Sequence, residues 1–120
     1  MGLQEWWRNR GRDGAAFPHD ENGDVLWGMQ CAGDDLRKER DMDFFFTFPH
    51  QSTAEQFSTR AGQQGYRVAV TWYENKQVWD ATCTIRLTPT HANVSQTEHA
   101  LTTAAQALGG APDGWGTASQ

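Results

Sequence analysis

Carboxylates are the residues of this sequence whose type and spacing point most clearly to chemistry. Of the 15 acidic residues, eight fall between positions 20 and 43, where only three basic residues accompany them. Carboxylates gathered on one surface attract a basic segment of a partner protein, although they also occur on surfaces that meet only water. Both interpretations stay open at this point. For the first, we expect four residues to contact a partner: Asp20, Glu21, Asp34 and Asp35.

Residues that serve catalysis or metal binding are present, but their spacing is wrong for either role. The four histidines are scattered, and none belongs to an HxxxH or HExxH pattern. Cys31 and Cys83 form no CxxC pair. The sequence contains no phosphate-binding glycine loop before a helix and no GxSxG motif. We therefore expect no catalytic residues, no metal, no cofactor and no enzymatic activity.

Three stretches of alternating apolar and polar residues predict the strands that must position these side chains. The stretches are 41–48, 66–73 and 78–87. Such alternation is typical of a strand with one buried face. The second and third stretches are separated by the polar residues 74–77, so they are expected to form an antiparallel hairpin.

Helical spacing of apolar residues predicts three helices between and beside the strands. They are expected over about 24–32, after Ser52–Glu55, which resembles a capping box, and over about 92–108. Glycines stand where each helix should stop. The buried stripe of the first helix is expected to consist of Val25, Leu26, Met29 and Ala32.

The core of this protein must rely on aromatic rings, because Leu and Ile are scarce while Phe and Trp number six each. The inward positions of the predicted strands hold a set of these rings, namely Phe44, Phe46, Phe48, Trp72 and Trp79. Trp115 lies between two glycines near residue 120, so it is either held by packing or exposed for contact with a partner. Trp27 lies beside the apolar stripe of the first helix, and the sequence leaves open whether its ring is buried or exposed.

These elements indicate an α+β fold, an antiparallel sheet with helices packed on one face. The expected order is helix, strand, helix, strand, strand, helix, with an optional short strand after it. Residues 17–120 should form one domain, because 120 residues are too few for two cores. Residues 1–16 form an arm that carries Trp6, Trp7 and several arginines.

The outward face of the sheet offers an alternative binding surface. Phe45 and Tyr73 would lie there with Arg67 and Arg86, a mixture found on sheets that bind single-stranded RNA. Direct nucleic-acid binding is nevertheless disfavoured, because acidic residues share this face and the net charge is −5. The sequence leaves open whether the acidic window or the sheet face is the interface.

The sequence also shows no pattern that is typical of a targeting signal. No stretch approaches the ~20 apolar residues of a membrane helix, and the first residues lack the basic and apolar regions of a secretory signal. With two cysteines and no disulfide framework, we expect a cytoplasmic protein that makes no membrane contact.

Several short motifs occur in an order that resembles one known family. They are Gly23-Asp24 at the start of the first helix, Gly33-Asp34-Asp35-Leu36, Asp41-Met42-Asp43-Phe44, Gly65-Tyr66-Arg67-Val68, Leu87-Thr88-Pro89-Thr90 and, most specific, Asp113-Gly114-Trp115-Gly116-Thr117. In this order the sequence resembles the RraB family of ribonuclease E inhibitors (regulator of ribonuclease activity B) over about 17–117.

The resemblance implies a ferredoxin-like sandwich and a bacterial protein that binds ribonuclease E and lowers its endonucleolytic activity. It also implies that the partner presents a basic, largely disordered segment, which suits an acidic docking surface. The arm at 1–16 has no counterpart in the family pattern, so the fold transfers more directly than the partner. An immunity-type module that neutralises another target is the alternative. Oligomeric state is not given by the sequence.

Overall fold

The computed structural model describes residues 9–120, and its elements follow the predicted order. Along the chain they are α2 (Glu21–Cys31), β1 (Arg40–Phe48), α3 (Gln51–Gln63), β2 (Arg67–Tyr73), β3 (Val78–Leu87), α4 (His91–Gln106) and β4 (Ala111–Thr117). The optional last strand is therefore present as β4, and the predicted α+β class is confirmed.

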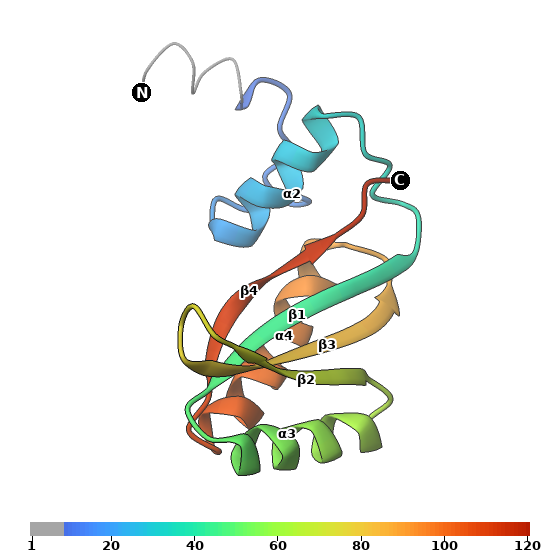
Figure 1. Cartoon of the computed structure of the whole chain (residues 1–120). Coiled ribbons are helices and arrows are strands. Elements are labelled where there is room, and N and C mark those ends of the chain that lie inside the picture. The colour runs from blue at the N-terminus through green and yellow to red at the C-terminus, as the bar shows by residue number, and fades with distance from the viewer. Residues whose placement is uncertain (1–8) are drawn as a thin grey trace.

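Within the described residues, four strands form an antiparallel sheet in the order β2-β3-β1-β4 (Figure 1). β1 pairs with β3 from Arg40 opposite Leu87 to Phe48 opposite Trp79. The predicted hairpin of β2 and β3 is also confirmed. With α3 and α4 connecting strands across the sheet, this is the ferredoxin-like arrangement.

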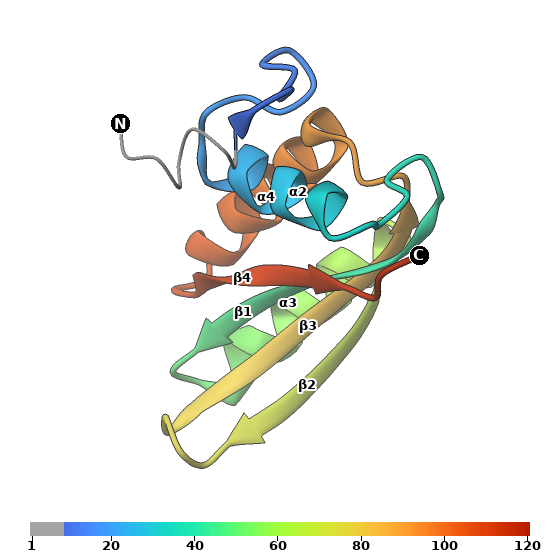
Figure 2. The same cartoon turned by 90° about the horizontal axis from the view of Figure 1, so that it is seen from above.

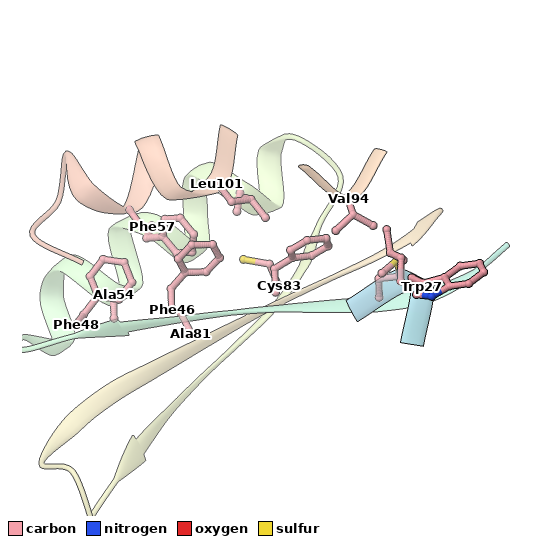
Figure 3. Close-up of a cluster of buried hydrophobic side chains, with 14 of the residues drawn as sticks. Trp27, Phe46, Phe48, Ala54, Phe57, Ala81, Cys83, Val94 and Leu101 are labelled. Atoms are coloured by element: carbon pink, nitrogen blue, oxygen red, sulfur yellow. The ribbon is translucent and has the colours of Figure 1, made fainter. Parts of the chain in front are cut away.

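One face of the sheet carries the core, and it does so mainly with phenylalanine rings. Figure 3 shows Phe46 and Phe48 directed from β1 toward Phe57 of α3. Both rings lie 5.2 Å from the Phe57 ring, measured between centroids. Val94 and Leu101 of α4 complete the cover and are almost fully buried. Burying each of these rings contributes on the order of 2 kcal/mol, which is how the fold succeeds with so few aliphatic residues.

The turn into β4 depends on a close approach between backbone and ring. A Cβ atom added to Gly110 would collide with the Phe48 ring. Only glycine therefore lets the chain pass this ring and bring β4 alongside β1.

Helix α2 differs from its prediction in both its start and its buried side. It begins at Glu21, and its buried residues include Leu26 and Trp27, whereas Val25 is 46% exposed. The Trp27 ring packs edge-on against Phe17 with 5.2 Å between centroids. The larger ring thus determines which side of the helix faces inward, and the expectation for Val25 and the exposed Ala32 was wrong.

The predicted core position of Trp72 was also wrong, since this residue is 42% exposed. Trp72 lies opposite Trp79 near the turn between β2 and β3, and their rings are 5.3 Å apart. This end of the hairpin extends beyond the helices (Figure 2). The alternation gave the correct face of the strand, but that face has no helix over its last residues.

The segment before Phe17 contacts the domain through Arg12, whose side chain is only 4% exposed. Its guanidinium donates to the carbonyl oxygens of Phe17 and Pro18 and pairs with Asp24 at 2.9 Å. Trp6 and Trp7 of the expected arm lie outside the described residues. Among residues 9–120, no helix is both long and apolar enough to span a membrane.

Candidate functional site: two hollows beside the start of α2

The first turn of α2 is held by Asp20, the residue just before the helix. Its carboxylate accepts a hydrogen bond from the Gly23 amide at 2.7 Å, as an N-cap does. The same carboxylate lies 2.8 Å from Nε2 of His91, at the start of α4. The Gly23 amide first, and His91 second, lower the pKa of Asp20. Asp20 thus remains charged while it joins the starts of two helices.

An apolar hollow of about 360 Å³ opens on one side of this joint. Its walls come from the segment before α2, from α2, from the loop before β1 and from the start of α4. The residues that line it are Ala15, Ala16, Phe17, Leu26, Leu36, Arg37, Pro89, Thr90, His91 and Ala92. A hollow of this composition suits an aliphatic or aromatic side chain of a partner.

Two pairs of polar side chains stand at the rim of the apolar hollow. One is the pair of Asp20 with His91 described above, and His91 lines the hollow. The other is Asp35 with Arg37, whose side chains meet at 2.9 Å and 3.1 Å. Hydrogen bonds from the Arg37 side chain and amide lower the pKa of Asp35 to about 2. The rim therefore keeps its carboxylates charged at neutral pH.

A second hollow, polar and about 420 Å³ in volume, opens on the other side of the first turn of α2. Glu21 and Glu98 line it together with His99, and residues of β4 form its floor. Asn22 supports this wall, since its amide nitrogen donates to Ser95 at 3.2 Å and to Glu98 at 3.1 Å. This hollow offers carboxylate oxygens to a basic side chain.

Trp115 of the closing motif is attached to this same wall. Its indole N–H donates to the side-chain oxygen of Asn22 at 2.9 Å, and the half-buried ring packs against the core. The open question from the sequence is thereby answered, because packing holds Trp115 in place. Gly114, with φ of 92°, lines the polar hollow, and Asp113 lies 4.0 Å from Lys76. Gly116 lies against Phe45.

Asp34 is placed differently from the other three predicted carboxylates. It is 6% exposed, and its carboxylate pairs at 2.8 Å with Arg40, which is 2% exposed. Arg40 also donates to the carbonyl oxygens of Lys38, Asp35 and Ala118. Hydrogen bonding by Arg40 lowers the pKa of Asp34. Asp34 therefore fastens the loop before β1 to the segment after β4, and it offers little surface to a partner.

The structure thus gathers Asp20, Glu21 and Asp35 around two hollows and places Asp34 in the interior. Sequence reasoning missed four residues of this site, His91, Asn22, Glu98 and Arg37. Three of them join α2 to α4 across some 70 positions of sequence, so local spacing carries no sign of the contact. The N-cap pattern of an aspartate before a helix was the one available signal.

The described residues offer little to support catalysis. Ser95, His91 and Asp20 are close together, but Ser95 and Asp20 both contact Nε2 of His91. A catalytic triad needs the base and its orienting carboxylate on different ring nitrogens. No group of three potential metal ligands occurs in residues 9–120. Burial raises the pKa of the Cys83 thiol to about 12, which leaves it unreactive.

On the open face of the sheet, Arg67 and Arg86 form ion pairs within the protein. Arg67 pairs with Asp41 at 3.2 Å, and Arg86 pairs with Glu39 at 3.0 Å. Thr84 donates a short hydrogen bond of 2.5 Å to Asp43. Neutralised arginines and nearby carboxylates make this face a poor match for phosphate.

Comparison with known proteins identifies the family of this chain. No curated protein matches the chain. A family model described as regulator of ribonuclease activity B matches residues 19–117, which includes the polar hollow, most of the residues that line the apolar hollow, the buried Arg40 pair and the closing motif around Trp115. The match covers most of the chain, and this protein belongs to the RraB family.

Proposed function

We propose that this protein is a non-enzymatic regulator that binds an endoribonuclease of the ribonuclease E type and lowers its cleavage of RNA. The family supports a role in regulating ribonuclease activity. The observation that carries the proposal furthest is that Glu21 and Glu98 line the polar hollow, while Asp20 and Asp35 contact two residues that line the apolar hollow, His91 and Arg37. That surface suits a basic segment of the enzyme.

Each hollow suits a different part of such a segment. The apolar hollow takes an aliphatic or aromatic side chain, while Glu21 and Glu98 of the neighbouring polar hollow attract the basic residues of the segment. The polar hollow takes the end of a lysine or arginine between Glu21 and Glu98. Inhibition then follows from occupying the segment rather than from chemistry on RNA. We place this role in the cytoplasm of a bacterium.

The test measures binding to purified ribonuclease E and cleavage of a labelled RNA. The site variant Asp20→Asn, Glu21→Gln, Asp35→Asn removes three charges, and asparagine at position 20 preserves the helix cap. The control Asp41→Asn, Glu55→Gln, Glu74→Gln removes the same charge from exposed residues outside the two hollows. We expect the site variant to bind about tenfold more weakly, with a smaller dependence on salt.

The identity of the partner and the location of the binding surface can be contradicted independently of each other. If the wild-type protein neither binds ribonuclease E nor slows cleavage at micromolar concentration, the partner is wrong, and an immunity-type module with another target takes its place. If it binds but both variants bind equally well, the surface beside α2 is not the interface. A gel shift of RNA by the protein alone at low salt would favour the sheet face instead.

A further inference from the structure

The outer edge of β2 is the largest regular feature of the fold that the proposed function does not use. β2 is the last strand of the sheet on its side, and Figure 2 shows no described segment beyond it. Its pairing with β3 runs without a shift from Arg67 opposite Thr84 to Tyr73 opposite Val78. The outward backbone groups of an edge strand with regular pairing are a template for another strand.

The usual features that protect such an edge are missing from β2. Its sequence, Arg-Val-Ala-Val-Thr-Trp-Tyr, contains no proline, glycine or lysine, and its only charge is at Arg67. Apolar side chains lie along the helix-facing side of this edge, where Val68 and Val70 are half-buried and Trp72 is 42% exposed. Exposed backbone and exposed apolar side chains therefore coincide on one strand.

We propose that β2 pairs with β2 of a second copy of this chain, which joins the two sheets into one. Antiparallel strands place residues directly opposite each other on the same face. The register centred on Val70 pairs the whole strand with itself. It sets Val68 of one copy opposite Trp72 of the other, and Arg67 opposite Tyr73.

The chemistry of this register is self-complementary. On the helix-facing side, Val68 covers the exposed Trp72 ring of the other copy, a pairing of a β-branched with an aromatic residue. On the open face, Arg67, which pairs with Asp41 of its own copy, lies opposite Tyr73 of the other copy. The three residues nearest the twofold axis, 69–71, are uncharged.

Repulsion between the two copies is small in this arrangement. The two Arg67 residues lie at opposite ends of the paired strands, about 20 Å apart, which exceeds the Debye length in physiological salt. The acidic surface beside α2 is not part of β2, so the dimer leaves the proposed ribonuclease site free.

Sedimentation equilibrium of the full chain tests this directly. Between about 1 µM and about 1 mM protein, we expect the mass to rise from one copy to two. The variant Ala69→Lys, Thr71→Lys places four lysines around the axis of the dimer on exposed positions and should stay monomeric. Thr103→Lys, Gln106→Lys adds the same charge to exposed positions of α4 and should dimerise as the wild type does.

Amide hydrogen exchange supplies the second measurement. Amides of β2 that do not bond to β3 should exchange more slowly as the concentration rises, while amides of β4 should not change. A wild type that stays monomeric up to about 1 mM would overturn the proposal. So would a lysine variant that dimerises as strongly as its control, or protection that appears at β4 instead.

Discussion

The edge strand β4 carries Pro112, Gly114, Gly116 and one extra residue relative to β1, whereas the edge strand β2 on the opposite side carries none of these. Proline lacks the amide that another strand would need, and the extra residue of β4, between Pro112 and Trp115, bends the strand away from regular pairing. The same sheet therefore has one protected edge and one open edge.

This difference between the two edges coincides with the position of the family motif around Trp115, which lies on β4. On β4, the irregular residues direct Trp115 to the wall beside α2 and place Gly114 in the polar hollow. The proposed ribonuclease site thus lies beside the irregular edge, while the regular edge is the one that we propose pairs with a second copy. The following predictions change one edge and compare the result with the other, beginning with the largest effect.

Asp34→Ala should disturb the β4 edge most, because it leaves the Arg40 guanidinium buried without a counter-charge. Breaking a buried pair in this way costs about 3–5 kcal/mol in the free energy of unfolding. Urea denaturation measures it. The control Asp41→Ala breaks exposed pairs only, and should cost less than about 1 kcal/mol. Equal losses in the two variants would mean that Arg40 does not hold the segment after β4.

Acid should weaken the same edge. The pKa of Asp34 is lowered below its ordinary value of 3.8 when the protein folds. The unfolded chain therefore binds the proton more readily, so the stabilisation is complete above about pH 4 and is lost as the pH falls through the folded pKa. Denaturation midpoints of wild type and Asp34→Ala should converge as the pH falls from about 4 through the folded pKa of Asp34. A constant difference between them would contradict the assignment.

Trp115→Ala should cost about 2–3 kcal/mol, since it removes a half-buried ring and its hydrogen bond to Asn22. Trp72→Ala on the β2 edge removes a ring that is 42% exposed and should cost less than half as much in the monomer. Thermal unfolding at low protein concentration makes the comparison. If Trp72 proved the more important residue, the roles of the two edges would be reversed.

Gly114→Ala should cost about 1 kcal/mol, because φ is 92° at this position and the penalty is confined to the backbone. Gly116 is the matched control. A Cβ atom there would meet Phe45 at 3.6 Å, an ordinary contact, so Gly116→Ala should change stability less. Urea midpoints that rank the two glycines in the opposite order would exclude the backbone explanation.

The smallest effect is expected at the open edge. Ala69→Lys, Thr71→Lys should change the stability of the monomer by less than about 0.5 kcal/mol, because both side chains are exposed. Thermal unfolding at a concentration where the wild type is also monomeric isolates this number. A large loss would show that the two positions matter to the monomer itself.

Most of the fold was predictable from the sequence because its strands are strongly periodic. Phe44, Phe46 and Phe48 alternate with polar residues, so both the strand and its buried face followed directly. Trp72 followed the same alternation, but periodicity gives only the face of a strand and not whether a helix covers it. The predicted cap at Ser52–Glu55 also failed, since α3 begins at Gln51 without a side-chain cap.

The candidate site was predictable only in part, because its members meet through contacts distant in sequence. Asp20 and Glu21 are adjacent, and their position before a helix pointed to a surface. Asp34 was indistinguishable from Asp35 in the sequence, yet one enters the interior and the other does not. What separates them is the guanidinium of Arg40, whose burial depends on the segment after β4.

The central place of β1 has a consequence for how the chain is made. Phe44 pairs with Cys83 on one side and with Trp115 on the other. A ribosome therefore releases β1, with its phenylalanines, well before either neighbouring strand has been synthesised. Until β3 emerges, α2, α3 and β2 are the described elements available to shield those rings. Nascent chains of this protein should thus be at greatest risk of aggregation during that interval, and fast translation from β1 to β3 would shorten it.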